Sequence, residues 1–302
     1  MSTNKVLATP AWPTRSLSEL GERIWVVFGG GGVRGVAHAG AWQALIEARV
    51  PVAGIVGTSI GALIGACVSG GMPWEQLVRL GLSLEKNDIA RLNRGVIWVN
   101  GIREESVFRG DVLKEYIERV LPVSDWSSLS IPLQVNAVDL ATGRTEWFGH
   151  GAREDVTLAD ACYASTALGV LYPPARIDGQ LFVDGGTDDV LPCDRAMALG
   201  ATGIIAVDVG SGEHADAERV LEQGLVAMHD RLFAIMSGRQ RREMVGAWDG
   251  PPLLYVRPAL DGYSAFAFEH VKYFLEEGYR SMRRMLSEGA SGSESLGRPS
   301  AG

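Results

Sequence analysis

Short apolar runs and longer amphipathic stretches alternate in the first part of the chain. The runs at residues 24–28 and 52–56 are short and rich in β-branched side chains, which favours buried strands. Apolar positions with helical spacing follow them at residues 36–49 and 60–69. The pattern therefore predicts that the chain begins with a parallel β-α-β unit.

The rest of the chain continues this alternation, without an evident internal repeat. Residues 133–140 and 144–148 predict a hairpin, and Asp178-Gly179 predicts the loop of a second one between residues 175–177 and 180–182. The other predicted elements are helices at residues 156–164, 220–242 and 267–286 and strands at residues 204–209 and 253–256.

Each of the first two predicted strands is followed by a glycine-rich loop. The first loop is Gly29-Gly30-Gly31-Gly32-Val33-Arg34-Gly35, whose bare N–H groups suit a phosphate or the oxyanion of a tetrahedral intermediate. The second is Gly57-Thr58-Ser59-Ile60-Gly61, which has the Gly-x-Ser-x-Gly spacing of a nucleophile elbow. The two loops together indicate acyl-transfer chemistry.

The first loop also fits the dinucleotide-binding pattern Gly-x-Gly-x-x-Gly, at Gly30, Gly32 and Gly35. A dinucleotide-binding fold has an acidic residue at the end of the second strand, about 20 residues further on. Here that strand ends in Val56-Gly57-Thr58-Ser59. Dinucleotide binding is therefore a minor alternative.

A nucleophilic serine needs a base. The late histidines are His214, in a polar run, and His229 and His270, in helix-like stretches, so each is expected to be a solvated side chain. Asp184 ends the apolar run before Gly185-Gly186, and two glycines let the backbone turn sharply and leave the carboxylate at the edge of the sheet. Asp184 is the better candidate.

Together, the glycine loop with Arg34-Gly35, the elbow and Asp184-Gly185-Gly186 resemble the patatin-like phospholipases. Residues 34–40 and 164–174 add further matches, and the resemblance runs from about residue 25 to residue 208. It implies an α/β fold with three layers, α/β/α, around a central, mostly parallel sheet. It also implies a Ser–Asp dyad that hydrolyses lipid acyl esters.

The resemblance assigns Ser59 as nucleophile and Asp184 as general base, with Gly57 and Gly61 flanking the serine in the elbow. Backbone N–H groups around Gly31 and Gly32 are expected to form the oxyanion hole, within the segment Gly30, Gly31, Gly32, Val33, Arg34 and Gly35. Arg34 is expected to hold this loop in place. A carboxylate has a pKa near 3.9 in water, so the base requires a dry, apolar site.

Length and composition fit one large α/β domain. The 302 residues are 46% hydrophobic, which is ample for a core. The three motif blocks span most of the chain, so we expect one acyl hydrolase domain over residues 20–287. Residues 1–19 would be an N-terminal extension, and residues 288–302, rich in serine and glycine, a disordered tail.

Charge and cysteine content narrow the partners and the location. The net charge of −8, from 28 basic and 36 acidic residues, argues against a nucleic-acid partner and leaves any membrane docking to apolar side chains. Cys67, Cys162 and Cys193 have no paired spacing and are expected to be buried thiols. No signal-peptide or transmembrane pattern is present, so we expect a cytoplasmic protein with peripheral contact to membranes.

We expect a carboxylic ester hydrolase of the phospholipase A or lysophospholipase type, acting on a lipid or acyl-ester substrate in lipid degradation, without cofactor or metal. The alternatives are a non-catalytic or regulatory lipid-binding module and a Ser-His-Asp esterase. The apolar run at residues 95–101, bracketed by glycines, predicts either a buried strand or a flap. In a flap, Ile97 and Trp98 would cover the dyad and touch lipid.

Overall fold

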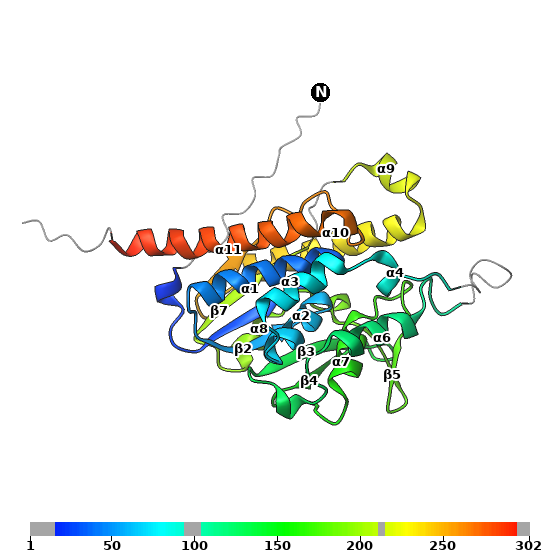
Figure 1. The fold of residues 1–302 in the computed structure, drawn as a ribbon, viewed down its shortest axis with the longest axis horizontal. Helices are drawn as coiled ribbons and strands as arrows, with labels where there is room; N and C mark the ends of the chain where they lie inside the picture. Colours follow the sequence, from blue (N-terminus) through cyan, green and yellow to red (C-terminus); the bar gives the residue numbers. More distant parts are fainter. Residues whose placement is uncertain (1–15, 94–103, 211–214, 295–302) are drawn as a thin grey trace, which may run out of the picture.

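A sheet of eight strands organises the protein, whose computed structural model describes residues 16–93, 104–210 and 215–294 (Figure 1). The strands are β1 Ile24–Phe28, β2 Val52–Gly57, β3 Leu133–Asp139, β4 Thr145–Gly149, β5 Ala175–Ile177, β6 Gln180–Asp184, β7 Gly203–Val207 and β8 Leu253–Val256. The α-helices are α1 Ala37–Glu47, α2 Ile60–Ser69, α3 Trp74–Ser83, α4 Lys86–Ile89, α6 Gly110–Val120, α7 Leu158–Thr166, α8 Cys193–Ala198, α9 Ala217–Glu222, α10 Leu225–Gly246 and α11 Val271–Glu294.

The sheet is mixed but mostly parallel. Its strand order is β5-β6-β3-β2-β1-β7-β8, and β4 pairs with β3 outside this path. The central strands β3, β2, β1, β7 and β8 all run parallel. The antiparallel strand pairs are β3 with β4, β3 with β6, and β5 with β6. The carboxyl ends of the parallel strands therefore meet at one edge, where ligands bind in open α/β sheets.

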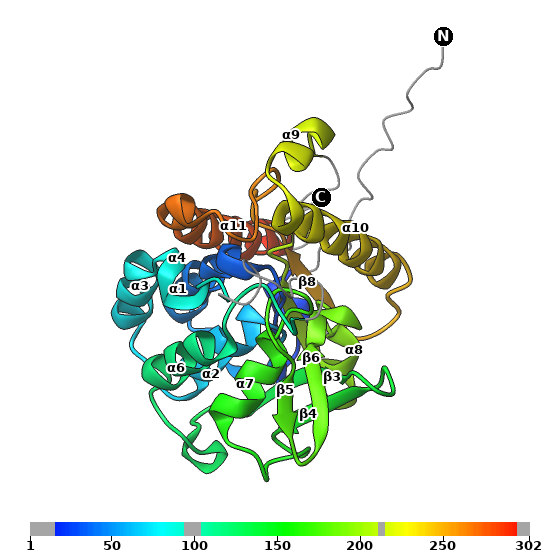
Figure 2. The same ribbon diagram turned by 90° about the vertical axis from the view of Figure 1, so that its right-hand side faces the viewer.

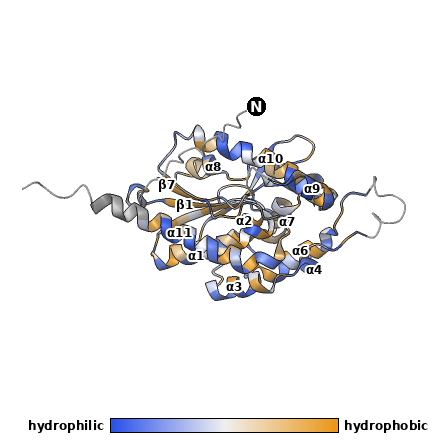
Figure 3. Cartoon of the chain, turned by 90° about the horizontal axis from the view of Figure 1, so that it is seen from above, coloured by the Kyte–Doolittle hydropathy of each residue, from blue (hydrophilic) through white to orange (hydrophobic). Residues whose placement is uncertain are grey.

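Helices cover both faces of the sheet and give three layers. Successive side chains of β1 point to opposite faces, and all five are buried, as expected for a central strand. Val26 and Phe28 join the larger core with α1, α2 and α7, whereas Trp25 and Val27 join the smaller core with α8. Figures 2 and 3 show these helix layers on either side of the strands. The predicted α/β/α fold is confirmed.

Most predicted elements form near their expected bounds, including both hairpins. The single helix predicted at residues 220–242 is wrong, because Gly224 adopts φ 82 and separates α9 from α10. The helix predicted at residues 36–49 begins instead as a 3₁₀ turn, Gly32–Val36, and α1 ends at Glu47.

The predicted domain boundary at residue 287 falls inside α11, which continues to Glu294. An established helix extends readily because each added residue closes one more backbone hydrogen bond. The apolar run at residues 95–101 and His214 lie outside the described residues. Within the described part of the chain, no helix is both long and apolar enough to cross a membrane.

Candidate active site

Ser59 lies in a strained turn between β2 and α2. Its φ of 55° and ψ of −125° are rare for a residue with a side chain, and such strain is typical of functional positions. The turn is packed tightly against β1, since a Cβ at Gly61 would lie 2.0 Å from the carbonyl oxygen of Phe28. The turn therefore has the nucleophile-elbow geometry that the sequence predicts, with the serine as the residue preceding the helix.

Strand pairing brings Asp184 to this serine. On β3, Val135 pairs with Gly57 of β2, and Ala137 pairs with Asp184 of β6. Strand β4 pairs with both of these β3 residues, so β2 and β6 must share the opposite edge of β3. Strands β2 and β6 run in opposite directions along this edge, so the carboxyl end of β2 faces the carboxyl end of β6.

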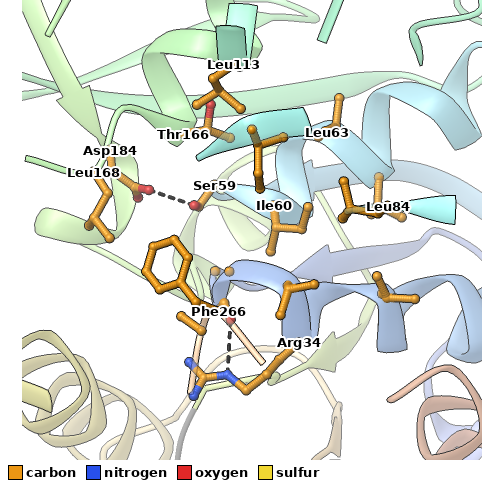
Figure 4. Close-up of a pocket in the computed structure, with 18 of the residues that line it drawn as sticks. Arg34, Ser59, Ile60, Leu63, Leu84, Leu113, Thr166, Leu168, Asp184 and Phe266 are labelled. Atoms are coloured by element: carbon orange, nitrogen blue, oxygen red, sulfur yellow. Dashed lines mark hydrogen bonds between the residues drawn. The ribbon is translucent and has the colours of Figure 1, made fainter. Parts of the chain in front are cut away.

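The two side chains are in direct contact. The Ser59 hydroxyl donates a hydrogen bond of 2.6 Å to Oδ2 of Asp184 (Figure 4). The other carboxylate oxygen, Oδ1, accepts a bond of 2.8 Å from the N–H of Gly186. Burial raises the pKa of Asp184 to about 7, although the bonds from Ser59 and Gly186 act in the opposite direction. Near neutral pH this carboxylate is a far stronger base than an exposed one.

The glycine loop lies beside the serine. A Cβ on Gly30 would lie 3.3 Å from the Cβ of Ser59. Two N–H groups of the predicted oxyanion segment are already occupied, since Gly30 donates to the carbonyl of Val190 and Val33 to that of Ala265. Within the described residues, the N–H groups of Gly31 and Gly32 have no protein acceptor. The donors open to a ligand therefore centre on Gly31 and Gly32.

The side chain of Arg34 anchors this glycine loop through hydrogen bonds to backbone carbonyls. Its guanidinium is buried and donates to the carbonyl of Gly31 at 3.0 Å and to that of Tyr263 at 2.8 Å. Gly32 has φ +61, and a Cβ there would lie 2.5 Å from the carbonyl oxygen of Ala265. The loop is thus held against the segment that contains Tyr263 and Ala265.

Three side chains that support the site were not identified from the sequence. The Ser165 hydroxyl accepts the N–H of Ser59 at 2.9 Å and so holds the elbow. The Asn136 amide donates to the carbonyls of Gly185 and Asp189, next to Asp184. Nε2 of His38 lies 2.8 Å from the carbonyl of Gly29. Ser165 belongs to a block that supports the family resemblance, whereas nothing near Asn136 in the sequence indicates its contacts.

The described histidines do not contact the serine. His38 is fully buried, and burial lowers its pKa to about 4, so it is neutral. The His229 ring hydrogen-bonds to the backbone of Gly169, and His270 stacks on Tyr263. Neither these residues nor His150 line the pocket that contains Ser59. Within the described residues, the partner of Ser59 is a carboxylate.

A largely apolar pocket of about 130 Å³ opens beside Ser59 and Asp184. Its wall includes one face of α2, where Ile60, Leu63, Ile64 and Cys67 recur at helical spacing. Further apolar side chains from α3, α4, α6 and two loops complete the wall: Leu77, Leu80, Leu84, Ile89, Leu113, Tyr116, Leu168 and Phe266. Figure 4 shows several of these side chains around Ser59 and Asp184. The pocket suits a hydrocarbon chain.

Neither the cysteines nor any acidic cluster offers a metal site in the described part of the chain. Cys67, Cys162 and Cys193 are free and buried, as expected from their spacing. Burial raises the pKa of Cys67 to about 12, so it is a thiol rather than a thiolate. Across the described ranges, no group of three or more His, Cys, Asp or Glu side chains is arranged to hold a metal ion.

Sequence comparisons match the region that contains the site. A family model for patatin-like phospholipase matches residues 26–197, more than half of the chain. An uncharacterized NTE family protein of Mycobacterium bovis is 31% identical over 191 residues, which cover 63% of this chain and 50% of that protein. Patatin-like phospholipase domain-containing protein 7 of Rattus norvegicus is 29% identical over 283 residues, covering 86% of this chain and 20% of that protein. The chain thus spans half or less of the length of these relatives.

A solved structure shares the fold. VipD from Legionella pneumophila superposes with a TM-score of 0.57 at 14% sequence identity, covering 89% of this chain and 67% of that chain. A similarity at this level of identity concerns the arrangement of strands and helices alone.

Proposed function

Because the chain belongs to the patatin-like phospholipase family, we propose that it is a serine acyl hydrolase that cleaves carboxylic ester bonds of lipids. One observation carries the proposal: the strained Ser59 donates a 2.6 Å hydrogen bond to a buried Asp184 whose pKa is about 7. A serine hydroxyl in contact with a carboxylate of this basicity is activated for nucleophilic attack.

The proposed reaction proceeds in two halves. Asp184 takes the proton of the Ser59 hydroxyl as the oxygen attacks the ester carbonyl carbon, and the resulting oxyanion accepts hydrogen bonds from the N–H groups of Gly31 and Gly32. Collapse breaks the ester bond, and the departing alcohol takes the proton from Asp184. The base then activates a water molecule, which releases the fatty acid and restores Ser59.

The position of Ser59 at the start of α2 favours the same step. Ser59 precedes the first residue of a ten-residue helix, Ile60–Ser69, whose positive dipole end lies next to the reacting atoms. Negative charge that develops on the carbonyl oxygen during attack is stabilised there. Each well-aligned donor in such a site contributes about 2.7–4 kcal/mol of transition-state stabilisation.

The surroundings of the site suit an amphiphilic ester. A second cavity of about 640 Å³ shares Asp230, Ala234 and Phe266 with the apolar pocket. Charged side chains of both signs line it, among them Lys86 and Glu269. We therefore propose that the acyl chain occupies the apolar pocket and the polar remainder of the lipid lies toward this cavity. This arrangement favours a substrate of the phospholipase A or lysophospholipase type.

A panel of phospholipids, lysophospholipids and simple acyl esters tests this proposal through released fatty acid. We expect release by the wild-type protein and by Ser128→Ala, a matched serine exposed on the surface. We expect none by Ser59→Ala. Equal release by Ser59→Ala would contradict the proposal, and a folded wild-type protein that hydrolyses no ester in the panel would favour a non-catalytic lipid-binding module.

A further inference from the structure

The glycine loop beside Ser59 rests on a segment that is neither helix nor strand. Residues 257–267 lie between β8 and the short turn that precedes α11. In this segment, the carbonyl of Ala265 accepts a 2.8 Å hydrogen bond from the N–H of Val33. A Cβ on Gly32 would lie 2.5 Å from the same carbonyl oxygen, so the two backbones are in close contact. A shift of this segment would therefore move the N–H groups of the glycine loop.

A single carboxylate on helix α10 holds the segment in place. Oδ2 of Asp230 accepts a hydrogen bond of 3.0 Å from the Ser264 hydroxyl and one of 3.1 Å from the N–H of Ala265. The Ser264 hydroxyl oxygen in turn accepts the N–H of Phe266 at 3.2 Å. Hydrogen bonds to an ionised acceptor are about twice as strong as those between neutral groups. Asp230 thus fixes the conformation of three consecutive residues.

The backbone of Ala265 connects Asp230 to the glycine loop. Its N–H donates to Asp230, and its carbonyl accepts from Val33. One residue therefore transmits any displacement of the carboxylate to the loop. Figure 4 shows Phe266, the next residue along the segment, on the same side of Ser59 as Arg34.

Asp230 also acts on the loop through its charge. The buried guanidinium of Arg34 donates to the backbone carbonyls of Gly31 and Tyr263. Burial lowers the pKa of Arg34, and the negative charge of Asp230 is the strongest influence in the opposite direction. The carboxylate therefore favours the charged form of the side chain that anchors the loop.

The position of Asp230 separates it from the core of the protein. Asp230 is half-buried and lines both the apolar pocket and the second cavity. Its two hydrogen bonds run to the segment behind the glycine loop, across the junction of these cavities. Loss of its side chain should therefore affect the loop more than the packing of the sheet.

We propose that Asp230 is a positioning residue for ester hydrolysis, which holds the N–H groups of Gly31 and Gly32 in place through residues 263–265. Donors of this kind stabilise an oxyanion only when they lie within about 0.5 Å of the productive geometry. Asp230 itself transfers no proton and does not contact the reacting atoms. Its role in hydrolysis rests on the proposed function, whereas its support of the loop does not.

Steady-state kinetics on a soluble ester provides the first test. We expect Asp230→Ala to lower kcat by about tenfold with little change in KM, because misplaced donors weaken binding of the transition state rather than of the acyl chain. Asp230→Asn keeps an acceptor oxygen for the same two donors and should recover most of kcat. Wild-type kcat in Asp230→Ala would overturn the proposal.

Glu277→Ala is the matched control. Glu277 is a buried carboxylate on α11 whose Oε1 also accepts one backbone N–H, from Ala259, and one serine hydroxyl, from Ser281. It does not line the apolar pocket. We expect its folded fraction to keep the wild-type kcat. An equal loss of kcat in Glu277→Ala and Asp230→Ala would overturn a specific role for Asp230.

An alkyl trifluoromethyl ketone tests the oxyanion donors themselves. The Ser59 oxygen forms a bond to the ketone carbon, its proton passes to Asp184, and the carbonyl electron pair moves to the oxygen, which becomes an oxyanion. We expect Asp230→Ala to weaken inhibition by this ketone about tenfold and to leave binding of the corresponding fatty acid unchanged. Equal weakening of both would show that Asp230 only shapes the pocket, which would overturn the proposal.

Amide hydrogen exchange in the ligand-free protein separates this proposal from the proposed function. In peptides that contain residues 29–36, we expect exchange to be about tenfold faster in Asp230→Ala and unchanged in Glu277→Ala, because the protected N–H of Val33 depends on Ala265. Unchanged exchange in Asp230→Ala would overturn the proposal. Faster exchange in a protein that hydrolyses no ester would instead contradict the proposed function and leave the support of the loop by Asp230 standing.

Discussion

Two aspartates, Asp184 and Asp208, begin from nearly the same local structure and reach opposite electrostatic states. Asp184 ends β6 and Asp208 directly follows β7, and each is only 2% exposed. In each, Oδ1 accepts a 2.8 Å hydrogen bond from the N–H of the glycine two residues later. The two carboxylates differ in which groups face Oδ2.

The groups around Oδ2 decide the outcome. Asp184 meets the neutral hydroxyl of Ser59, and burial raises its pKa to about 7. Asp208 meets Arg241, Arg257 and the hydroxyl of Tyr255. Burial opposes ionisation of Asp208 too, but the two guanidinium groups hold its pKa below the ordinary value. The same turn motif thus gives a carboxylate of raised pKa beside a neutral hydroxyl and a carboxylate of lowered pKa beside two guanidinium groups.

The largest expected effect is on ester hydrolysis, which should differ between variants of the two aspartates. We expect Asp184→Asn, like Ser59→Ala, to lower ester hydrolysis by about 10⁴-fold or more, because a dyad acts as a unit. Asp208→Asn should retain most of the turnover of its folded fraction, since Asp208 does not contact Ser59. Fatty acid release at matched folded concentration measures this. Substantial turnover by Asp184→Asn would show that Asp184 is not the base.

For stability, the substitution of Asp208 should have a larger effect than that of Asp184. Asp208→Asn removes the charged partner that lies 3.0 Å from the buried Arg241, so we expect the free energy of unfolding to fall by about 3–5 kcal/mol at neutral pH. Urea unfolding followed by circular dichroism gives the value. A loss below about 1 kcal/mol would show that Asp208 is not an anchor.

The pH dependence of stability should differ in sign. The pKa of Asp184 rises from 3.8 to about 7 on folding, so between these values the folded state binds the extra proton. The wild type therefore loses stability as pH rises through this window, whereas an asparagine does not titrate. The free energy of unfolding of Asp184→Asn, relative to that of wild type, should therefore be greater at pH 8 than at pH 4 by up to about 4 kcal/mol.

Unfolding in urea at both pH values tests this difference. Asp208→Asn should change in the other direction, because the pKa of Asp208 is lowered on folding and its ionised form stabilises the wild type at higher pH. A stability difference between Asp184→Asn and wild type that stays constant from pH 4 to pH 8 would contradict the raised pKa.

A smaller effect should come from the glycine loop. Arg34→Ala removes the bonds to the carbonyls of Gly31 and Tyr263, so the proposed oxyanion donors lose their support. We expect kcat to fall by about ten- to a hundredfold with little change in KM, because misplacement of such donors by about 1 Å costs about that much. Steady-state kinetics on a soluble ester measures kcat and KM. A kcat equal to that of wild type would show that the loop keeps its position without Arg34.

Local pattern predicted much of this fold. The strand Ile24–Phe28 and the helix Ile60–Ser69 form at their predicted bounds, because each has a complete apolar pattern and clear flanking glycines. The contact between Ser59 and Asp184, 125 positions apart, was expected from the family resemblance and follows from the antiparallel pairing of β6 with β3.

Other features depend on contacts that leave no local signal. The ion pair of Asp208 with Arg241 joins a strand end to a distant helix, and nothing near either residue indicates the partner. Occupation of the Gly30 N–H by the carbonyl of Val190 likewise depends on tertiary packing. The division of α9 from α10 depends on the conformation of Gly224, which the helical apolar pattern around it conceals.

The rate at which a fluorophosphonate labels the protein, measured from pH 5 to pH 9, tests the central claim most directly. We predict that the label resides on Ser59, that the wild-type rate rises with a single ionisation near pH 7, that Asp184→Asn is not labelled, and that Asp208→Asn keeps the wild-type profile. Labelling of Asp184→Asn at the wild-type rate, or attachment of the label to another residue, would contradict the account.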